Sequence, residues 1–161
     1  EKVRVLFSAH GLPERVIQRG DPYQWQVEQS VAAVRKLLPA AWEYRTCYQS
    51  RVGPMKWIGP STEDEIHAAA QAQTGVIVSP IAFVSEHVET LVELDIEYAQ
   101  RAHELGLPYY LRAPALGAAP RFIDALADLT ERALAQPGKL CSEQGERLCP
   151  GTHKLCPHRS A

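Results

Sequence analysis

The segment Gly75-Val76-Ile77-Val78-Ser79 is the stretch of this sequence that says most about its fold. Its β-branched residues favour a strand, and its continuous apolar run is typical of a strand that is buried on both faces. Such strands occur mainly in parallel sheets whose two faces are covered by helices. The sequence on either side of this segment should therefore alternate helices with further strands.

Further strands and helices do alternate along the chain. Strands are predicted over residues 3–8, 42–49 and 108–112, in addition to residues 75–79. Asp21 and Pro22 suit an N-cap and a first helical position. A capping box, either Thr62 with Glu65 or Ser61 with Asp64, opens another helix. The β-α-β-α-β-α-β-α order predicts an α/β fold with an open parallel four-stranded sheet, a Rossmann-type three-layer sandwich. The helices are expected over residues 22–38, 61–73, 85–105 and 120–135.

Length and composition indicate one compact domain. The 161 residues are 45% hydrophobic and 22% charged, which is enough apolar material for a core. We expect that domain over residues 1–138, followed by a cysteine-containing tail over residues 139–161. The formal net charge is -2 and the sequence has no Lys/Arg run, so nucleic acid is not an expected partner.

Neither a membrane span nor secretion is predicted. The longest apolar stretch, residues 76–84, is interrupted by Ser79 and Pro80 and is shorter than the roughly 20 residues that cross a bilayer. The chain opens at Glu1 without a signal pattern and enters an apolar run at Val3, which suggests a cut inside a longer protein. Because three of the four cysteines lie in the tail, a reducing, cytoplasmic compartment is expected.

Unusual residues follow three of the predicted strands, where ligands of open α/β sheets bind. His10 follows the first strand, and a loop rich in Gly and Pro, residues 51–60, follows the second. The residues after the third strand are Phe83, Glu86, His87 and Glu89. These loops are expected to meet at one edge of the sheet, although His10 alone could simply hydrogen-bond its own loop.

An acidic stripe is predicted on the helix over residues 85–105. Glu86, Glu89, Glu93 and Glu97 recur at i, i+3, i+7 and i+11, so a regular helix places all four carboxylates on one face. A solvated acidic face is the simplest interpretation, but the stripe begins near His10 and its first turn carries His87. Imidazole and carboxylate groups together suit a divalent cation of intermediate hardness such as Fe²⁺, and they can also accept protons.

Two further residues have structural interpretations. Asp95 is expected to pair with an Arg or a backbone N–H, because a buried Asp must be paired or hydrogen-bonded. Cys47 lies within a predicted strand and is expected in the core, where free cysteines are common. The helix face of Asp95, which should pack on the sheet, also carries Val88, Leu91, Val92, Ala99 and Ala102.

Four blocks of the sequence resemble ferrochelatases, and they occur in the family's order. The resemblance covers nearly the whole chain but only the C-terminal half of the family's protein. The blocks are Phe7-Ser8-Ala9-His10-Gly11-Leu12-Pro13, Arg19-Gly20-Asp21-Pro22-Tyr23, Tyr48-Gln49-Ser50-Arg51-Val52-Gly53-Pro54 with Trp57-Ile58-Gly59-Pro60, and Pro80-Ile81-Ala82-Phe83-Val84-Ser85-Glu86-His87-Val88-Glu89-Thr90-Leu91 with Glu93-Leu94-Asp95-Ile96-Glu97-Tyr98.

The resemblance implies a chelatase-like fold of two similar α/β domains, of which this chain would be the second. The implied activity is insertion of Fe²⁺ into protoporphyrin IX with loss of two protons, the last step of haem synthesis. His10 and Glu89 would face each other in the pocket, and the resemblance leaves open which handles protons and which handles iron. Glu93 and Glu86 would continue an acidic path for metal or protons. The porphyrin pocket would be lined by Tyr23, Trp57, Phe83 and His87.

The tail is similar to an extension that carries a [2Fe–2S] cluster in some ferrochelatases. Its cysteines are Cys141, Cys149 and Cys156, whose spacings match neither a zinc knuckle nor a ferredoxin run. In the similar proteins, three cluster ligands come from the tail and one from the N-terminal half. Thr152 stands where the animal pattern has a cysteine, so Cys141 would have to substitute, and free thiols remain the alternative.

Two other functions remain open on the sequence. A chelatase of this fold could act on coproporphyrin or insert cobalt or nickel into another tetrapyrrole, and a non-catalytic metal-binding or redox module could use the tail cysteines alone. The expected partners are protoporphyrin IX, Fe²⁺ and the N-terminal domain, without which the chain should be poorly active. A homodimer and peripheral membrane contact through an apolar lip are left open.

Overall fold

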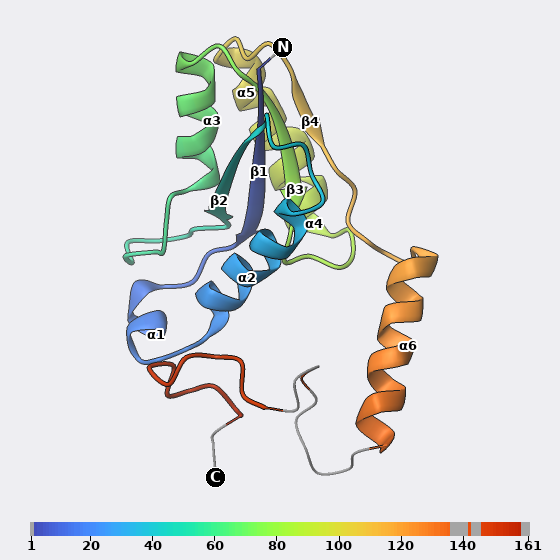
Figure 1. Cartoon of the computed structure of the whole chain (residues 1–161). Helices are drawn as coiled ribbons and strands as arrows, with labels where there is room; N and C mark the ends of the chain where they lie inside the picture. The colour runs from blue at the N-terminus through green and yellow to red at the C-terminus, as the bar shows by residue number, and fades with distance from the viewer. Residues whose placement is uncertain (1, 136–141, 143–145, 159–161) are drawn as a thin grey trace.

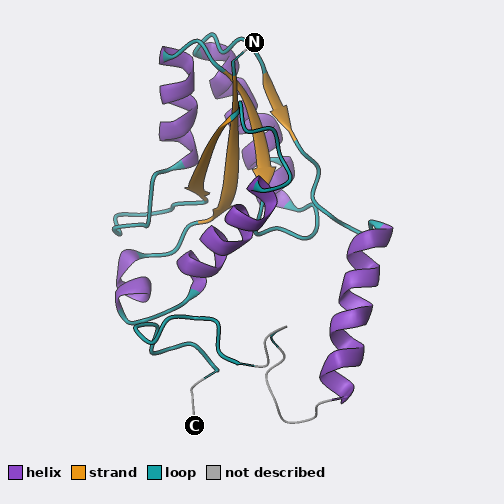
Figure 2. Ribbon diagram, in the orientation of Figure 1, coloured by secondary structure: helices purple, strands orange, loops and turns teal. Residues whose placement is uncertain are grey.

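The computed structural model describes residues 2–135, 142 and 146–158, and its centre is a four-stranded, all-parallel sheet. The strands are ordered β2-β1-β3-β4, so the predicted α/β sheet is confirmed (Figures 1 and 2). Each predicted strand is present, with bounds that shift by two residues at most. The strands are β1 (Val3–His10), β2 (Glu43–Gln49), β3 (Gly75–Pro80) and β4 (Tyr110–Arg112).

Helices cover both faces of the sheet, as the buried strands require. Alternate residues of β1 point to opposite faces, so Val5 and Phe7 pack with α2 (Tyr23–Arg35) while Leu6 packs with the helices on the other side. That other side is covered by α3 (Thr62–Gln71) and by α5 (Ala99–Glu104). One helix was not predicted: α1 (Glu14–Gln18), a short helix between β1 and α2.

The expected continuous helix over residues 85–105 is wrong in its start and in its regularity. The helical segment begins at Val88 as α4 (Val88–Leu91), continues as a π-helix, η1 (Glu93–Tyr98), and ends as α5. His87 forms the N-cap, and its side chain accepts a hydrogen bond from the backbone N–H of Glu89. Glu86 therefore lies outside the helix and cannot belong to a helical stripe.

The wide π-turn also changes which side chains reach the core. In η1 the N–H of Glu97 donates to the carbonyl of Val92, five residues back, so positions beyond it rotate away from a regular helical wheel. Leu94 is fully buried, whereas Val88 is 66% exposed and Ile96 is 58% exposed. The expected apolar face is therefore wrong for the first turns and right for Ala102, which is buried against the sheet.

Two single-residue predictions are confirmed. Both carboxylate oxygens of Asp95 accept hydrogen bonds from the guanidinium of Arg112 on β4, although the Asp95 side chain is one-third exposed rather than buried. The thiol of Cys47 is fully buried between β1 and α3, where it contacts the Thr62 hydroxyl, and burial raises its pKa to about 12. Cys47 is therefore a core residue and a poor nucleophile.

The last helix, α6 (Pro120–Ala135), extends away from the sheet and contains no buried residue (Figure 1). Most of its large apolar side chains are exposed, so the apolar face of this long amphipathic helix is not covered by the described residues. No helix among the described residues is long and apolar enough to cross a membrane. The exposed apolar residues of α6 are Ile123, Leu126, Leu129 and Leu134.

The π-turn can be tested by the free energy of unfolding. Leu94→Ala should lower it by about 2–5 kcal/mol, because it opens a cavity at a fully buried position. Ile96→Ala, two residues further on and largely exposed, should change it by less than about 0.5 kcal/mol. Urea unfolding of both variants measures this difference, and equal losses would contradict the described packing.

Candidate active site

The candidate site lies at the point where the strand order changes direction. The chain passes from β1 outward to β2 and then returns past β1 to β3, so the carboxyl ends of β1 and β3 flank a topological switch point. Open α/β sheets bind their ligands at such points. His10 is the last residue of β1, and the loop after β3 leads to His87 and Glu89. The predicted meeting of these loops is therefore confirmed.

His10 and Glu89 face each other at this edge. His10 Nδ1 lies 2.5 Å from the carbonyl oxygen of Gly11, and Nε2 lies 3.4 Å from Glu89 Oε1. A carbonyl oxygen can only accept, so Nδ1 donates to it, and in the neutral imidazole Nε2 is then the nitrogen whose lone pair faces the carboxylate. Both side chains are about one-third exposed, at 39% and 34%, so solvent or a ligand can reach them. The pair is suited to hold one shared proton.

His87 and Phe83 lie beside this pair. The His87 ring contacts the Phe83 ring at a centroid distance of 5.2 Å, and Phe83 is 8% exposed. His87 Nδ1 accepts the Glu89 N–H at 3.2 Å and lies 3.8 Å from Glu89 Oε2. His87 therefore fixes the backbone of the residue that meets His10, with Phe83 behind it.

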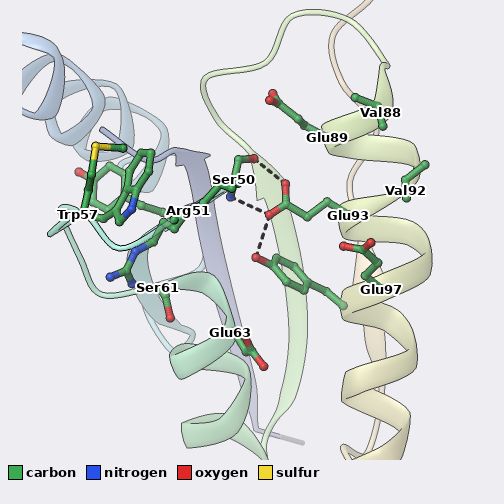
Figure 3. A pocket seen from close by; sticks show the side chains of 15 residues that line it. Ser50, Arg51, Trp57, Ser61, Glu63, Val88, Glu89, Val92, Glu93 and Glu97 are labelled. Atoms are coloured by element: carbon green, nitrogen blue, oxygen red, sulfur yellow. Dashed lines mark hydrogen bonds between the residues drawn. The ribbon is translucent and has the colours of Figure 1, made fainter. Parts of the chain in front are cut away.

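Glu93 is anchored more tightly than any other carboxylate of the described site. Its two oxygens accept hydrogen bonds from the Ser50 N–H (2.6 Å), the Ser50 hydroxyl, Gln49 Nε2 (2.9 Å) and the Tyr98 hydroxyl (2.9 Å). Figure 3 shows Ser50 donating to Glu93 across the gap between the β2 loop and η1. Burial and the neighbouring Glu93 charge raise the pKa of Tyr98, so its hydroxyl stays protonated as a donor.

Gln49 is a site residue that the sequence did not single out. It is fully buried at the end of β2, in register with His10, and its Oε1 accepts from the Ser8 hydroxyl at 2.7 Å. Its Nε2 also donates to the Glu89 carbonyl at 2.7 Å. The only sequence signal was its place at the carboxyl end of a strand beside the His10 strand. That signal does not predict the contact with Glu89.

An open cavity of about 650 Å³ separates the β2 loop from α4 and η1. Three of the four predicted stripe residues, Glu89, Glu93 and Glu97, line it, together with Glu63 from α3 (Figure 3). Trp57 lines the other side, and Val88 and Val92 are exposed at its edge. The cavity therefore combines an acidic wall with apolar and aromatic surface.

Glu86 and Tyr23 lie differently from the sequence expectation. Glu86 turns to β4, where it accepts from Arg112 at 2.8 Å and from the Ala115 N–H at 2.9 Å, and it does not line the cavity. The Tyr23 hydroxyl donates to the backbone carbonyl of His10 at 2.9 Å. Burial, then the charge of Glu89, raise the Tyr23 pKa, so this hydroxyl remains a donor.

The tail cysteines lie elsewhere, against α2. Cys149 and Cys156 line a cavity of about 580 Å³ together with Trp25, and Cys156 is 3% exposed. Cys141 lies outside the described residues. Within the described ranges, no group of three or more His, Cys, Asp or Glu side chains is arranged to hold a metal ion.

Comparison with known proteins gives the family. A family model described as Ferrochelatase matches residues 1–134. The chain belongs to the ferrochelatase family. It is 58% identical over 158 residues to the ferrochelatase of Caulobacter vibrioides, covering 98% of this chain and 45% of that protein. It is 54% identical to the ferrochelatase of Phenylobacterium zucineum, covering 98% of this chain and 46% of that protein. The chain thus spans less than half the length of these ferrochelatases.

The new position of Glu86 predicts a pH dependence of stability. Hydrogen bonds from Thr90 and Arg112 lower the Glu86 pKa from 4.5 to about 2. Its ionised form therefore stabilises the fold above about pH 4.5, and this contribution is lost as the pH falls toward 2. Glu86→Gln should be less stable than the wild type above pH 4.5, and the difference should shrink on acidification. Urea unfolding over this pH range would contradict the assignment if the difference stayed constant.

Proposed function

We propose that this chain forms the half of a ferrochelatase that carries the proton-accepting site, and that the whole protein inserts Fe²⁺ into protoporphyrin IX. The observation that carries the proposal is the His10–Glu89 pair, 3.4 Å apart, at the switch point of a family fold and beside an acidic cavity. Membership of the ferrochelatase family supports the substrate class. Fe²⁺ is a substrate in this scheme, and the product is protohaem.

The geometry favours His10 as the proton acceptor. Iron insertion releases the two pyrrole N–H protons of the porphyrin, and the free lone pair of His10 Nε2 can accept one of them. Glu89 would stabilise the imidazolium that forms, as a carboxylate partner does for a catalytic histidine. The cavity lined by Glu93 and Glu97 would then give protons a way to solvent. Four donors hold the Glu93 carboxylate, so Glu93 would fix this cavity wall in place in addition to any contact with iron.

The aromatic residues would act in two groups. Trp57, with Val88 and Val92, offers the flat apolar surface that a macrocycle needs. Phe83 and Tyr23 would act from behind, because Phe83 contacts His87 and Tyr23 holds the His10 carbonyl. Glu86 belongs to the ion pair with Arg112 and would reach neither iron nor porphyrin.

The remaining half of the protein would close the site. The apolar residues Val88 and Ile96 and the apolar face of α6 are exposed, and the related ferrochelatases are more than twice as long as this chain. An N-terminal domain packed against these surfaces would exclude water from the porphyrin. The cytoplasmic location, the homodimer and the peripheral membrane contact stay predictions of the sequence.

The first test is iron insertion by the full-length protein under anaerobic conditions, followed in the Soret band. His10→Ala should lower kcat by at least about 100-fold, since it removes the proton acceptor. His103→Ala, an exposed histidine at the far end of α5, should leave kcat unchanged. Parallel assays with protoporphyrin and coproporphyrin identify the tetrapyrrole, and full activity of His10→Ala would rule the proposal out.

We also propose that the tail holds a [2Fe–2S] cluster. Cys149 and Cys156 fit part of such a site, because their thiols hydrogen-bond to each other and line one cavity beside α2. Thr152 is exposed and offers no thiolate, so the further ligands would be Cys141 and a cysteine of the N-terminal half. A bound cluster would supply a redox-active iron centre at the edge of the domain.

The cluster predicts a spectrum that depends on the tail thiols. Full-length protein purified anaerobically should show visible iron–sulfur absorption and acid-labile sulfide, and both should be lost in Cys149→Ser. Cys47→Ala is the matched control, because Cys47 is buried in the core and should not affect the cluster. Protein without sulfide, or with an unchanged spectrum in Cys149→Ser, would show that these cysteines are free thiols.

A further inference from the structure

The C-terminal turn, residues 147–156, folds back against the connection between α1 and α2 (Figure 1). The N–H of Leu155 donates to the carbonyl of Gly20 at 3.0 Å, and the ring of His153 contacts that of Trp25 at a centroid distance of 6.2 Å. A segment more than 120 residues away in sequence thus joins one of the family blocks, Arg19 to Tyr23.

The C-terminal turn is a formed structure rather than a loose tail. One nitrogen of the Arg147 guanidinium donates to the carbonyls of Pro150 and His153, both at 2.8 Å. The N–H of Cys156 donates back to the His153 carbonyl at 3.0 Å, and Cys156 is almost fully buried. These bonds hold the peptide of Leu155 in the orientation that reaches Gly20.

Gly20 is the contact point and admits no side chain. Its φ is +99°, a conformation that L residues rarely adopt, and a Cβ there would lie 2.6 Å from the backbone nitrogen of Lys154. Both constraints require glycine, but only the second concerns the C-terminal turn. Gly106 has the first constraint without the second, since its φ is +70° and nothing lies within 4 Å of the position a Cβ would take.

A short path leads from Gly20 to the active-site histidine. Asp21 follows Gly20, and its carboxylate accepts the N–H of Tyr23 at 2.8 Å, which fixes the first turn of α2. The Tyr23 hydroxyl then donates to the His10 carbonyl at 2.9 Å. The carbonyl of His10 and the ring that meets Glu89 belong to one residue, so a shift of Tyr23 moves the catalytic pair.

We propose that the C-terminal turn positions His10: by seating on Gly20 it fixes the start of α2, whose Tyr23 hydroxyl holds the His10 backbone. Gly20, Arg147 and Tyr23 are positioning residues in this scheme and touch no substrate. The catalytic consequence rests on the proposed function, whereas the structural consequence for His10 does not. The tail therefore contributes to the site through its backbone contacts, whether or not its cysteines bind a cluster.

The test compares Gly20→Ala with Gly106→Ala in the full-length protein. Gly20→Ala should unseat the C-terminal turn and lower kcat for iron insertion by about 10- to 100-fold, since small displacements of a catalytic group have effects of that size. KM for the porphyrin should change far less, because the loss falls on the reacting geometry and not on binding. Gly106→Ala also places a side chain at a positive φ, but without a clash, and should retain kcat. Loss of kcat in both variants alike, or in neither, would overturn the proposal.

A double-mutant cycle tests the route through Tyr23. Tyr23→Phe removes the hydroxyl that holds His10 and should itself lower kcat. If the C-terminal turn acts through Tyr23, adding Gly20→Ala to Tyr23→Phe should cause little further loss. If the double variant loses kcat by the product of the two single losses, the two residues act independently and the route through Tyr23 is wrong.

An activity-independent measurement separates this inference from the proposed function. The ring Cε1–H resonance of His10, assigned with His10→Ala, should shift in Gly20→Ala and in Arg147→Met but not in Gly106→Ala. Arg147→Met loosens the C-terminal turn without altering Gly20, so it serves if Gly20→Ala fails to fold. If the resonance shifts in these variants but the wild-type protein inserts no iron, only the proposed function is wrong. If the wild-type protein inserts iron but the resonance does not shift in these variants, only the positioning role is wrong.

Discussion

The buried side-chain amide of Gln49 joins the three segments on which the candidate site is built. Its oxygen accepts from Ser8 in β1, and its nitrogen donates to the Glu89 carbonyl and to the Glu93 carboxylate. Because Gln49 is fully buried, losing one partner would leave a polar group unsatisfied, at a cost of roughly 1–3 kcal/mol. The parallel pairing of β1 with β2 sets Gln49 level with His10. The Gln49 amide therefore helps to set the distance between His10 and Glu89, together with the contacts of His87 and Tyr23.

The π-turn that follows Glu89 distributes the remaining side chains between core and cavity. It sends Leu94 into the core and leaves Glu93 and Glu97 on the cavity wall, while Ile96 stays exposed. A π-turn is less favourable than a regular helix and is often found at functional sites. Here the four donors on Glu93 help to stabilise it, because two of them come from Ser50 on the opposite loop.

The proposed N-terminal domain would account for the exposure of the site. This chain covers 45% of the Caulobacter protein, and the His10–Glu89 pair, the apolar edge and the apolar face of α6 are all open to solvent. In water, the interaction between an exposed His10 and Glu89 is screened, so a covering domain would strengthen it as well as exclude solvent. The C-terminal turn supports the same pair from the opposite direction, through Gly20 and Tyr23.

Local sequence patterns predict the strands, the parallel sheet and the meeting of the loops that carry His10 and Glu89, whereas the resemblance to ferrochelatases pairs these two residues. Apolar β-branched runs such as Val76-Ile77-Val78 and the turns between them are local signals, and parallel strands place their carboxyl ends together whatever the details. The sequence also predicted that Asp95 needs a partner, because an unpaired carboxylate among apolar residues is costly. The tertiary structure alone decided that Glu86 leaves the stripe for Arg112, that η1 rotates the helix face, and that Gln49 and Gly20 hold the site. These outcomes rest on hydrogen bonds and close contacts between residues from 26 to more than 120 positions apart, which depend on strand register and chain packing and leave no periodic trace in the sequence.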